Sequence, residues 1–411
     1  MISNVRMARR TLLAAGAMLA LMSVPAVAGD VSAVHGRALV LDGHVDVLLP
    51  GTNARYYAPD GRSYTELDKL KAGGVDALVY AVAVSTGPDT PEGHAAARAE
   101  ADAKLAAIRK LAADHPADIA IALSAEDVRT IVGQGKIAVL ISFQNAYSLQ
   151  PDVAEFDRLK ADGVRVAALN HAGNNAFADS SRPQQGAGEQ HGGLSPLGKA
   201  AVGRLNDLGV LIDVSQLTPK GVFQTLELTR TPVVATHSAA RGLADNTRNL
   251  SDAELDAIKA NGGVVQVVPF NAYLLPSPAD YAPRLKALRA QYGLAADKPG
   301  YQGADDLPAE RRDAFFAAYR ALSPQATLKD YVDHIDYIAK RIGADHVGVG
   351  TDFNHGSGIP GFRDEADAPN VTCELLARGY SEEQVDAIWG GNFLRVLAAA
   401  EAGAKGQSKA D

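Results

Sequence analysis

Short runs of Val, Ile, Leu and Ala recur along this chain, and segments with the spacing of amphipathic helices separate them. The runs are apolar at nearly every position rather than at alternate positions, which is typical of parallel strands buried on both faces. Helix starts lie between them: Ser195 precedes Pro196, and Ser251 precedes Glu254 at the spacing of a capping box. The runs predict eight strands, at Ala38–Gly43, Val75–Val84, Ile137–Phe143, Val164–Leu169, Val210–Val214, Val233–Ala235, Val264–Val268 and His346–Gly350.

The order of these elements predicts the fold class. Eight strands that alternate with helices favour an α/β protein with a single (β/α)8 TIM barrel over residues 29–411. An open, doubly wound sheet is the alternative, because right-handed crossovers permit either topology. One connection is longer than an ordinary loop: the segment from Leu274 to Leu328 follows the seventh strand and precedes a predicted helix at Lys329–Ile342. We therefore expect an insertion after strand 7, over one face of the barrel.

The first 28 residues differ in composition from the rest of the chain. Arg9 and Arg10 precede an apolar run at residues 12–24, and a small-residue cleavage pattern ends at Ala28. The run is too short to span a bilayer comfortably, so residues 1–28 are predicted to be a signal peptide. The arginine pair fits a twin-arginine export signal as well as a plain basic leader. We expect an exported, periplasmic protein with no membrane span after processing.

The composition of the whole chain excludes some functions. Its 411 residues carry 40 Lys and Arg against 48 Asp and Glu, a net charge of −8, without a long basic block. Nucleic-acid binding needs clustered cations, so we expect no nucleic-acid partner. Cys373 is the only cysteine, which excludes an internal disulfide, and its helical surroundings predict a small buried hydrophobe.

Polar side chains stand at the carboxyl ends of the predicted strands, which converge on the face of a barrel that carries its chemistry. A single such residue is more often an ordinary structural group, and only the joint placement indicates a site. His44 and Asp46 point the same way along an extended segment, so both can hold one cation. Of the other histidines, His191 and His355 are candidate loop contributors. The full set of strand-end residues is His44, Asp46, Gln144, His171, Gln216, His237 and Asp352.

At these residues the chain resembles the membrane (renal) dipeptidase family, a branch of the metal-dependent amidohydrolase superfamily. The resemblance implies the barrel fold, hydrolysis of small peptides and a site that holds two zinc ions. It extends in order over almost the whole mature chain, through Asp42-Gly43-His44-Val45-Asp46, Leu169-Asn170-His171, Ala178-Asp179-Ser180-Ser181, Gly209 to Ser215, Thr236 to Arg241, Arg248-Asn249, Gly348 to Phe353 and Gly390 to Phe393.

The resemblance implies metal ligands, and two of them are missing here. His44 and Asp46 would hold the first zinc ion, and His237 would help to hold the second. Gln144 stands where the family has a Glu that bridges both metals, and Gln216 stands where it has a His. Two divalent ions about 3.5 Å apart repel by roughly 19 kcal/mol at an effective dielectric of about 20, and a neutral amide does not offset this repulsion. We therefore expect one zinc ion or none.

Three further residues would act on the substrate, as the resemblance implies. His171 would polarise the substrate carbonyl, Arg248 would bind the substrate carboxylate, and Asp352 would handle the proton of the attacking water. The chemistry suits these residue types, because Arg offers a bidentate fork for a carboxylate and a carboxylate beside zinc-activated water can accept its proton.

Three functions stay open on the sequence. The first is an exported, dipeptidase-like, metal-dependent hydrolase of small peptide or N-acyl amino-acid substrates, with one metal held by His44, Asp46 and His237 and with Asp352 as ligand or base. The second is a metal-independent tailoring enzyme for an exported peptide-like natural product, which would use His171, His237 and Asp352 as acid and base. The third is a non-catalytic peptide-binding protein. Each is compatible with a homodimer.

Overall fold

The structure, a computed structural model, describes residues 31–149, 151–183, 188–296, 298 and 300–405. The predicted signal peptide lies outside the described residues and stays a prediction. Nine strands form one sheet in which every pairing is parallel: β1 Leu41–Asp46, β2 Ala77–Ala83, β3 Ile119–Ile121, β4 Ile137–Gln144, β5 Val164–Ala168, β6 Leu211–Asp213, β7 Val234–Ser238, β8 Val264–Val267 and β9 Val347–Val349.

All strands except β3 close into a barrel, in the order β1-β2-β4-β5-β6-β7-β8-β9. The ends of this series meet just beyond β9, where Val45 pairs in parallel with Phe353. Asp46 N donates to Phe353 O at 3.0 Å, and Asp352 N donates to His44 O at 2.8 Å. The predicted (β/α)8 barrel is therefore confirmed, and the open sheet is excluded.

Strand β3 was not expected from the sequence. It has three residues and pairs only with β4, through Ile119–Ile121 against Ile137–Val139. It is as short as β6 and β9, but it lies beside the barrel rather than in its wall. The eight predicted strands all exist, although their bounds differ. The first strand, predicted at Ala38–Gly43, lies three residues later, and β7 continues past the predicted Ala235 to Ser238.

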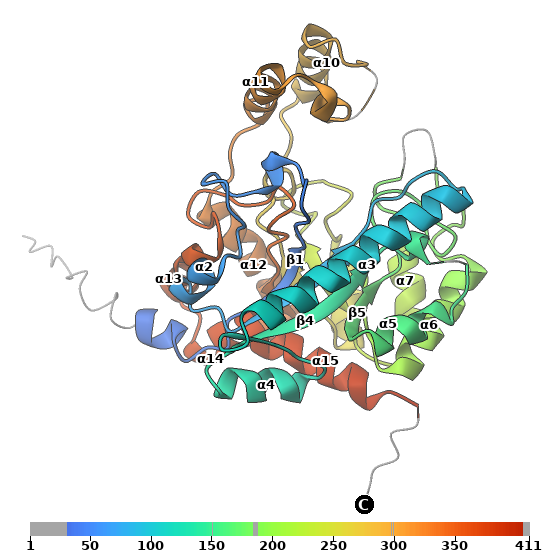
Figure 1. Ribbon diagram of the computed structural model, residues 1–411. Coiled ribbons are helices and arrows are strands. Elements are labelled where there is room, and N and C mark those ends of the chain that lie inside the picture. Colours follow the sequence, from blue (N-terminus) through green and yellow to red (C-terminus); the bar gives the residue numbers. More distant parts are fainter. Residues whose placement is uncertain (1–30, 150, 184–187, 297, 299, 406–411) are drawn as a thin grey trace, which may run out of the picture.

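Helices cover the outside of the barrel (Figure 1). The predicted starts are present: Ser195 accepts from Gly198 N, and Ser251 and Glu254 form a capping box. No helix among the described residues is long and apolar enough to cross a membrane. The helices are α2 Leu67–Ala72, α3 Pro91–Asp114, α4 Ala125–Gly133, α5 Glu155–Ala161, α6 Pro196–Leu208, α7 Pro219–Leu228, α8 Asp252–Asn261, α9 Asn271–Leu274, α10 Tyr281–Gln291, α11 Ala309–Arg320, α12 Leu328–Ile342, α13 Ala368–Ala377, α14 Glu382–Asp386 and α15 Asn392–Ala402.

The expected insertion forms a lobe that stands above the barrel and contains α10 and α11 (Figure 1). It has a small apolar core of its own, which includes Phe315 and Phe316. Arg55, from the segment after β1, holds the lobe: its guanidinium pairs with Asp305 at 2.5 Å and lies 4.3 Å from the ring centre of Tyr301. The lobe therefore packs against the loop that follows β1.

The predicted burial of Cys373 is wrong. Cys373 lies on α13 and is exposed, whereas Val371, Thr372 and Leu375 of the same helix are buried. Each residue turns an α-helix by about 100°, so the face that carries Val371 and Leu375 turns Cys373 toward solvent. The apolar neighbours of this cysteine in the sequence did not reveal which side of the helix it occupies.

Candidate metal and active site

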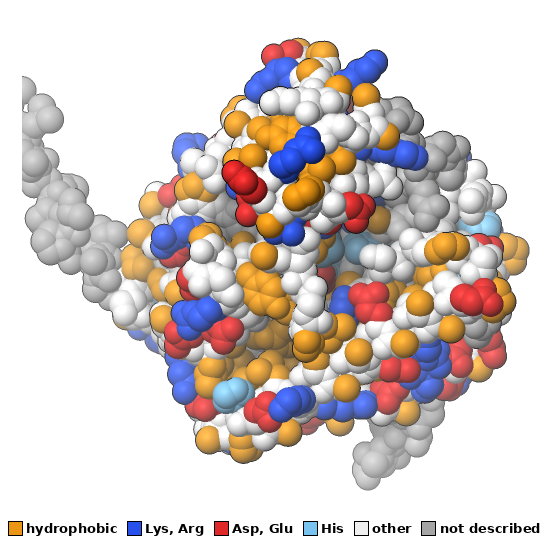
Figure 2. All heavy atoms as spheres, turned by 45° about the horizontal axis from the view of Figure 1, so that its top comes forward, with side chains coloured by type: hydrophobic (Ala, Val, Ile, Leu, Met, Phe, Trp, Pro, Cys, Tyr) orange, Lys and Arg blue, Asp and Glu red, His pale blue; other side chains and the backbone are white. Residues whose placement is uncertain are grey.

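The barrel brings all seven predicted strand-end residues to one face, and each of them is buried. His44 and Asp46 belong to β1, Gln144 ends β4 and His237 belongs to β7. The others follow strand ends by three residues: His171 after β5, Gln216 after β6 and Asp352 after β9. The view toward the insertion lobe shows histidine atoms in a recess below the lobe (Figure 2).

A threonine hydroxyl sets the protonation of two of these histidines. Thr236 Oγ1 donates to Asp213 Oδ2 at 2.6 Å, and it lies 3.0 Å from His44 Nδ1 and 2.8 Å from His237 Nδ1. The single O–H of Thr236 donates its hydrogen bond to the carboxylate, so the hydroxyl oxygen accepts from both Nδ1–H groups. The two imidazole rings stack with centres 3.9 Å apart, and each presents an unprotonated Nε2 to the site.

The lone pair of His237 is already used by the two glutamines. The amide nitrogens of Gln144 and Gln216 lie 3.2 Å and 3.0 Å from His237 Nε2. Burial lowers the pKa of His237 well below its ordinary value, and nearby cations, Arg248 among them, lower it further. His237 is therefore neutral and accepts from the amides. The two residues that replace metal ligands thus hydrogen-bond to the third ligand implied for that half of the site.

The lone pair of His44, in contrast, is open. His44 Nε2 and Asp46 Oδ1 are buried atoms without a hydrogen-bond partner, and they lie 3.9 Å apart. Asp352 Oδ1 also lies 3.9 Å from His44 Nε2, and one ligand atom from each of the three residues lies within 4.8 Å of the others. One imidazole nitrogen and two carboxylate oxygens are ligands that zinc accepts. This set therefore fits one metal ion, and the unpartnered atoms are what a cation would satisfy.

A second group, made of His44, Asp213 and His237, is equally compact. It does not fit an ion, because the hydroxyl of Thr236 bonds to the facing atoms of all three. His237 therefore takes no part in the open set, although the sequence placed it with His44 and Asp46.

His355 orients one of the carboxylates. Its Nδ1 lies 2.6 Å from Asp46 Oδ2, so the other oxygen of Asp46 is left for the site. Burial alone would raise the pKa of Asp46, but the charge and the hydrogen bond of His355, together with the charge of Lys104, hold it well below its usual range. Such outer partners fix the geometry of metal ligands. His355 is thus a contributor, whereas the other loop candidate, His191, bonds to Asn175 O.

Asp352 is held in a backbone conformation that non-glycine residues rarely adopt. Its φ is 55°, in the left-handed region, and its N–H donates to His44 O. Such backbone strain is often found at functional sites. Burial raises the pKa of Asp352, and so does the charge of Asp46, whereas the charge of His355 lowers it. The net shift is upward, which makes this carboxylate a better proton acceptor than a solvated one.

The structure gives His171 a state that its predicted role does not favour. Its Nδ1 lies 3.2 Å from Val84 O, so Nδ1 carries the proton and Nε2 is an acceptor. Burial lowers the pKa of His171 well below its usual value, and the charges of Arg182 and His355 act in the same direction. A neutral His171 with this tautomer accepts a hydrogen bond, whereas polarising a carbonyl needs a donor.

Arg248 is only 1% exposed, and its guanidinium ties two strand ends together. One nitrogen donates to Ser215 O, a second donates to His237 O at 2.9 Å, and Nε has no partner. Its binding of a substrate carboxylate stays a prediction. The contacts that the structure shows are structural ones between the ends of β6 and β7.

Four side chains near the site received no role from the sequence, which gave roles to ligand types at strand ends. Thr236 and Asp213 both lie inside the motifs that resemble the family. Their positions could have indicated a role, because Thr236 directly precedes His237 and Asp213 ends β6. The role of Arg182 is seen only in the structure, where its charge lowers the pKa of His171 and of His237. Lys104 stands in the middle of a 24-residue helix, where a lysine normally faces solvent. The sequence offered no signal for it.

Comparison with known proteins gives a consistent family. The sequence profile of "Membrane dipeptidase (Peptidase family M19)" matches residues 29–411. "Dipeptidase tcpJ" of Claviceps purpurea is 27% identical over 82% of this chain and 69% of its own length. "Dipeptidase aclJ" of Aspergillus oryzae is 30% identical over 64% of this chain, which spans only 51% of that relative.

Solved structures agree with this result. The probable dipeptidase PvdM from Pseudomonas aeruginosa superposes with a TM-score of 0.81 and 38% identity, over 93% of this chain and 100% of that one. A metallo peptidase from Rhodobacter sphaeroides, solved with a phosphinate mimic of the dipeptide L-Ala-D-Ala, superposes with a TM-score of 0.68 over 88% of this chain and 99% of that one. At 22% identity the second likeness shows the fold alone.

Replacing Thr236 by Val tests whether its hydroxyl organises the site. Thr236→Val removes the acceptor of two histidine N–H groups and the donor to Asp213, all of them buried. We expect the free energy of unfolding to fall by about 2–4 kcal/mol, measured by chemical denaturation. The control is Thr225→Val, since Thr225 is equally buried but makes one bond, to Gly221 O in its own helix. Equal losses in both variants would contradict the special role of Thr236.

Proposed function

This chain belongs to the membrane dipeptidase family, and on that premise we propose that it is a metal-dependent hydrolase of small peptide or N-acyl amino-acid substrates that works with one metal ion. One observation carries the proposal: the Nε2 lone pair of His44 is free to bind an ion, whereas that of His237 already accepts hydrogen bonds. His44 Nε2 faces two carboxylates and has no partner, whereas His237 Nε2 accepts from the two glutamines. His44, Asp46 and Asp352 would hold the ion.

The chemistry of the proposed site follows from its residues. When bound, a zinc ion supplies Lewis-acid polarisation and lowers the pKa of water. Asp46 is held by His355, so only one of its oxygens is available for the ion. Asp352 would give one carboxylate oxygen to the ion, and its second oxygen would accept the proton of the attacking water. His171 offers an acceptor at Nε2, which suits a substrate N–H.

The proposal extends to where the protein works. The leader pattern at residues 1–28, with Arg9-Arg10, supports export to the periplasm, and these residues lie outside the described part of the chain. We expect the full chain to be recovered shorter, in the periplasmic fraction, after expression in a Gram-negative host. Recovery at full length in the cytoplasm would contradict export. The homodimer also stays a prediction.

Elemental analysis of the purified protein tests the one-metal proposal. We expect close to one zinc ion per chain, loss of the ion in His44→Ala, and its retention in His237→Gln, because His237 does not belong to the open set. A chelator should abolish hydrolysis of dipeptides. Two ions per chain would contradict the proposal. Turnover that survives complete removal of metal would instead favour the metal-independent tailoring enzyme.

Restoring the family ligands tests why the second ion is missing. The double variant Gln144→Glu with Gln216→His replaces both amides at His237 by groups that can bind zinc. We expect the zinc content to rise from one toward two ions per chain and the rate of dipeptide hydrolysis to rise at least tenfold. Either single variant is the matched control and should gain less than the pair. No gain in zinc would show that the pocket has diverged at other residues as well.

A further inference from the structure

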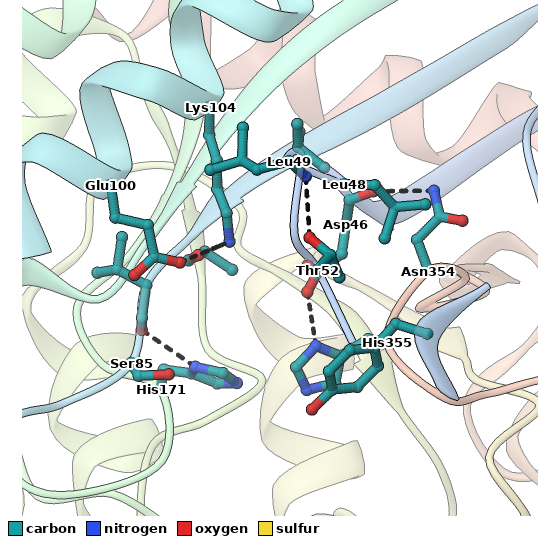
Figure 3. Close-up of a pocket in the computed structure, with 14 residues that line it drawn as sticks. Asp46, Leu48, Leu49, Thr52, Ser85, Glu100, Lys104, His171, Asn354 and His355 are labelled. Carbon is teal, nitrogen blue, oxygen red and sulfur yellow. Dashed lines mark hydrogen bonds and ion pairs between the residues drawn. The ribbon is translucent and has the colours of Figure 1, made fainter. Parts of the chain in front are cut away.

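A pocket of about 160 Å³ adjoins the proposed metal site, between α3 and the segments that follow β1 and β2 (Figure 3). Asp46 and His171 of the strand-end group line it, and Lys104 and Glu100 reach it from α3; in Figure 3, Asp46 lies to the right and Glu100 to the left, above His171. Apolar side chains form much of the wall between them: Val47, Leu48, Leu49 and Val84. A group bound at Asp46 and His171 can therefore extend a side chain toward α3.

Lys104 places a buried positive charge in this pocket. The residue is 9% exposed, and its Nζ donates to Ala83 O at 2.5 Å and lies 3.0 Å from Glu100 Oε1. An ammonium group has three N–H donors, and these contacts use two of them. Lysine is rarely buried to this extent without full pairing. Burying this ammonium group in the middle of α3 therefore lowers stability, and a lysine with a purely structural role would avoid that loss by facing solvent.

The charges around the pocket are not balanced evenly. The carboxylate of Glu100 is on a side chain that is 39% exposed, so water screens it more than it screens Lys104. The carboxylate of Asp46 is already paired with His355 at 2.6 Å. The lysine charge at the α3 end of the pocket is therefore only partly compensated, by the half-exposed Glu100 and by the field of Asp46, and an anion is the ligand that this end can hold.

We propose that Lys104 determines substrate specificity by binding the carboxylate of an acidic residue in the substrate. The inference deepens the proposed function and rests on it, because it takes the substrate to be a small peptide bound at Asp46 and His171. The acidic side chain would extend along the apolar wall and reach Nζ through the third N–H. Glu100 competes for the same ammonium, so it limits the preference for acidic substrates.

Variants of the two α3 residues should shift specificity in opposite directions. The measurement is the ratio of kcat/KM for glutamyl-alanine to that for glutaminyl-alanine, and likewise for alanyl-glutamate against alanyl-glutamine. Lys104→Met should lower the ratio of one pair about 10- to 100-fold, since a charge-assisted bond is lost. Glu100→Gln should raise the same ratio about 3- to 10-fold. The pair that responds identifies which residue of the dipeptide enters the pocket.

The matched control is Lys110→Met, which removes the same charge from an exposed lysine of the same helix that pairs with Asp114. It should leave both ratios unchanged. Unchanged ratios in a folded Lys104→Met, or a fall in the ratio for Glu100→Gln, would overturn the proposal. If Lys104→Met does not fold, the sign of the Glu100→Gln effect still decides.

Binding separates this proposal from the proposed function. Calorimetry with phosphinate analogues of the Glu and Gln dipeptides measures the same preference without turnover. If the wild-type protein hydrolyses no dipeptide but binds the Glu analogue at least tenfold more tightly through Lys104, the pocket assignment stands and the proposed hydrolysis fails. If it hydrolyses dipeptides without any Lys104-dependent preference, the pocket assignment fails alone.

Discussion

The hydroxyl of Thr236 is the group on which the chemistry of this barrel face depends. Its O–H donates to the buried carboxylate of Asp213, so its oxygen accepts from the Nδ1–H groups of both His44 and His237. The two rings are thereby fixed with their Nε2 lone pairs toward the recess, whatever occupies it. Asp213 accepts that hydrogen bond on one carboxylate oxygen and the hydroxyl of Ser215 on the other. A cation-binding site is thus prepared by a side chain that cannot itself contact the cation.

The distribution of charge then favours a cation at only one of the two lone pairs. Beside His44 lie the carboxylates of Asp46 and Asp352, whereas the charges that act on His237 are those of other cationic groups, Arg248 among them. A divalent ion placed near His237 would be opposed by these charges and would find neutral amides as neighbours. The same ion near His44 would meet two carboxylates. Geometry and electrostatics therefore favour the same half of the site, independently of any family comparison.

The sequence predicted the architecture well. For the site, it predicted which residues come together but not which of them are in contact. Continuous apolar runs identify buried parallel strands, and strand ends converge in any barrel, so the seven strand-end residues could be grouped before their distances were known. Which of them touch is a different matter. The contacts of Gln144 and Gln216 with His237 join three strands, and they depend on register and depth that no single strand encodes. Lys104 was missed for a related reason, since periodicity does not tell that a helix leans over a pocket.

The two glutamines act as a coupled pair rather than as two independent losses. Both amides donate to one nitrogen, so His237 stays satisfied only as long as at least one of them remains. A carboxylate at position 144 has no proton to give, and it would face the lone pair of His237 unless a proton or a cation lay between them. The single substitution Gln144→Glu therefore creates repulsion before it creates a complete second site. This coupling provides a physical reason why the two positions should change together, because residues that share a partner are not additive in their effects.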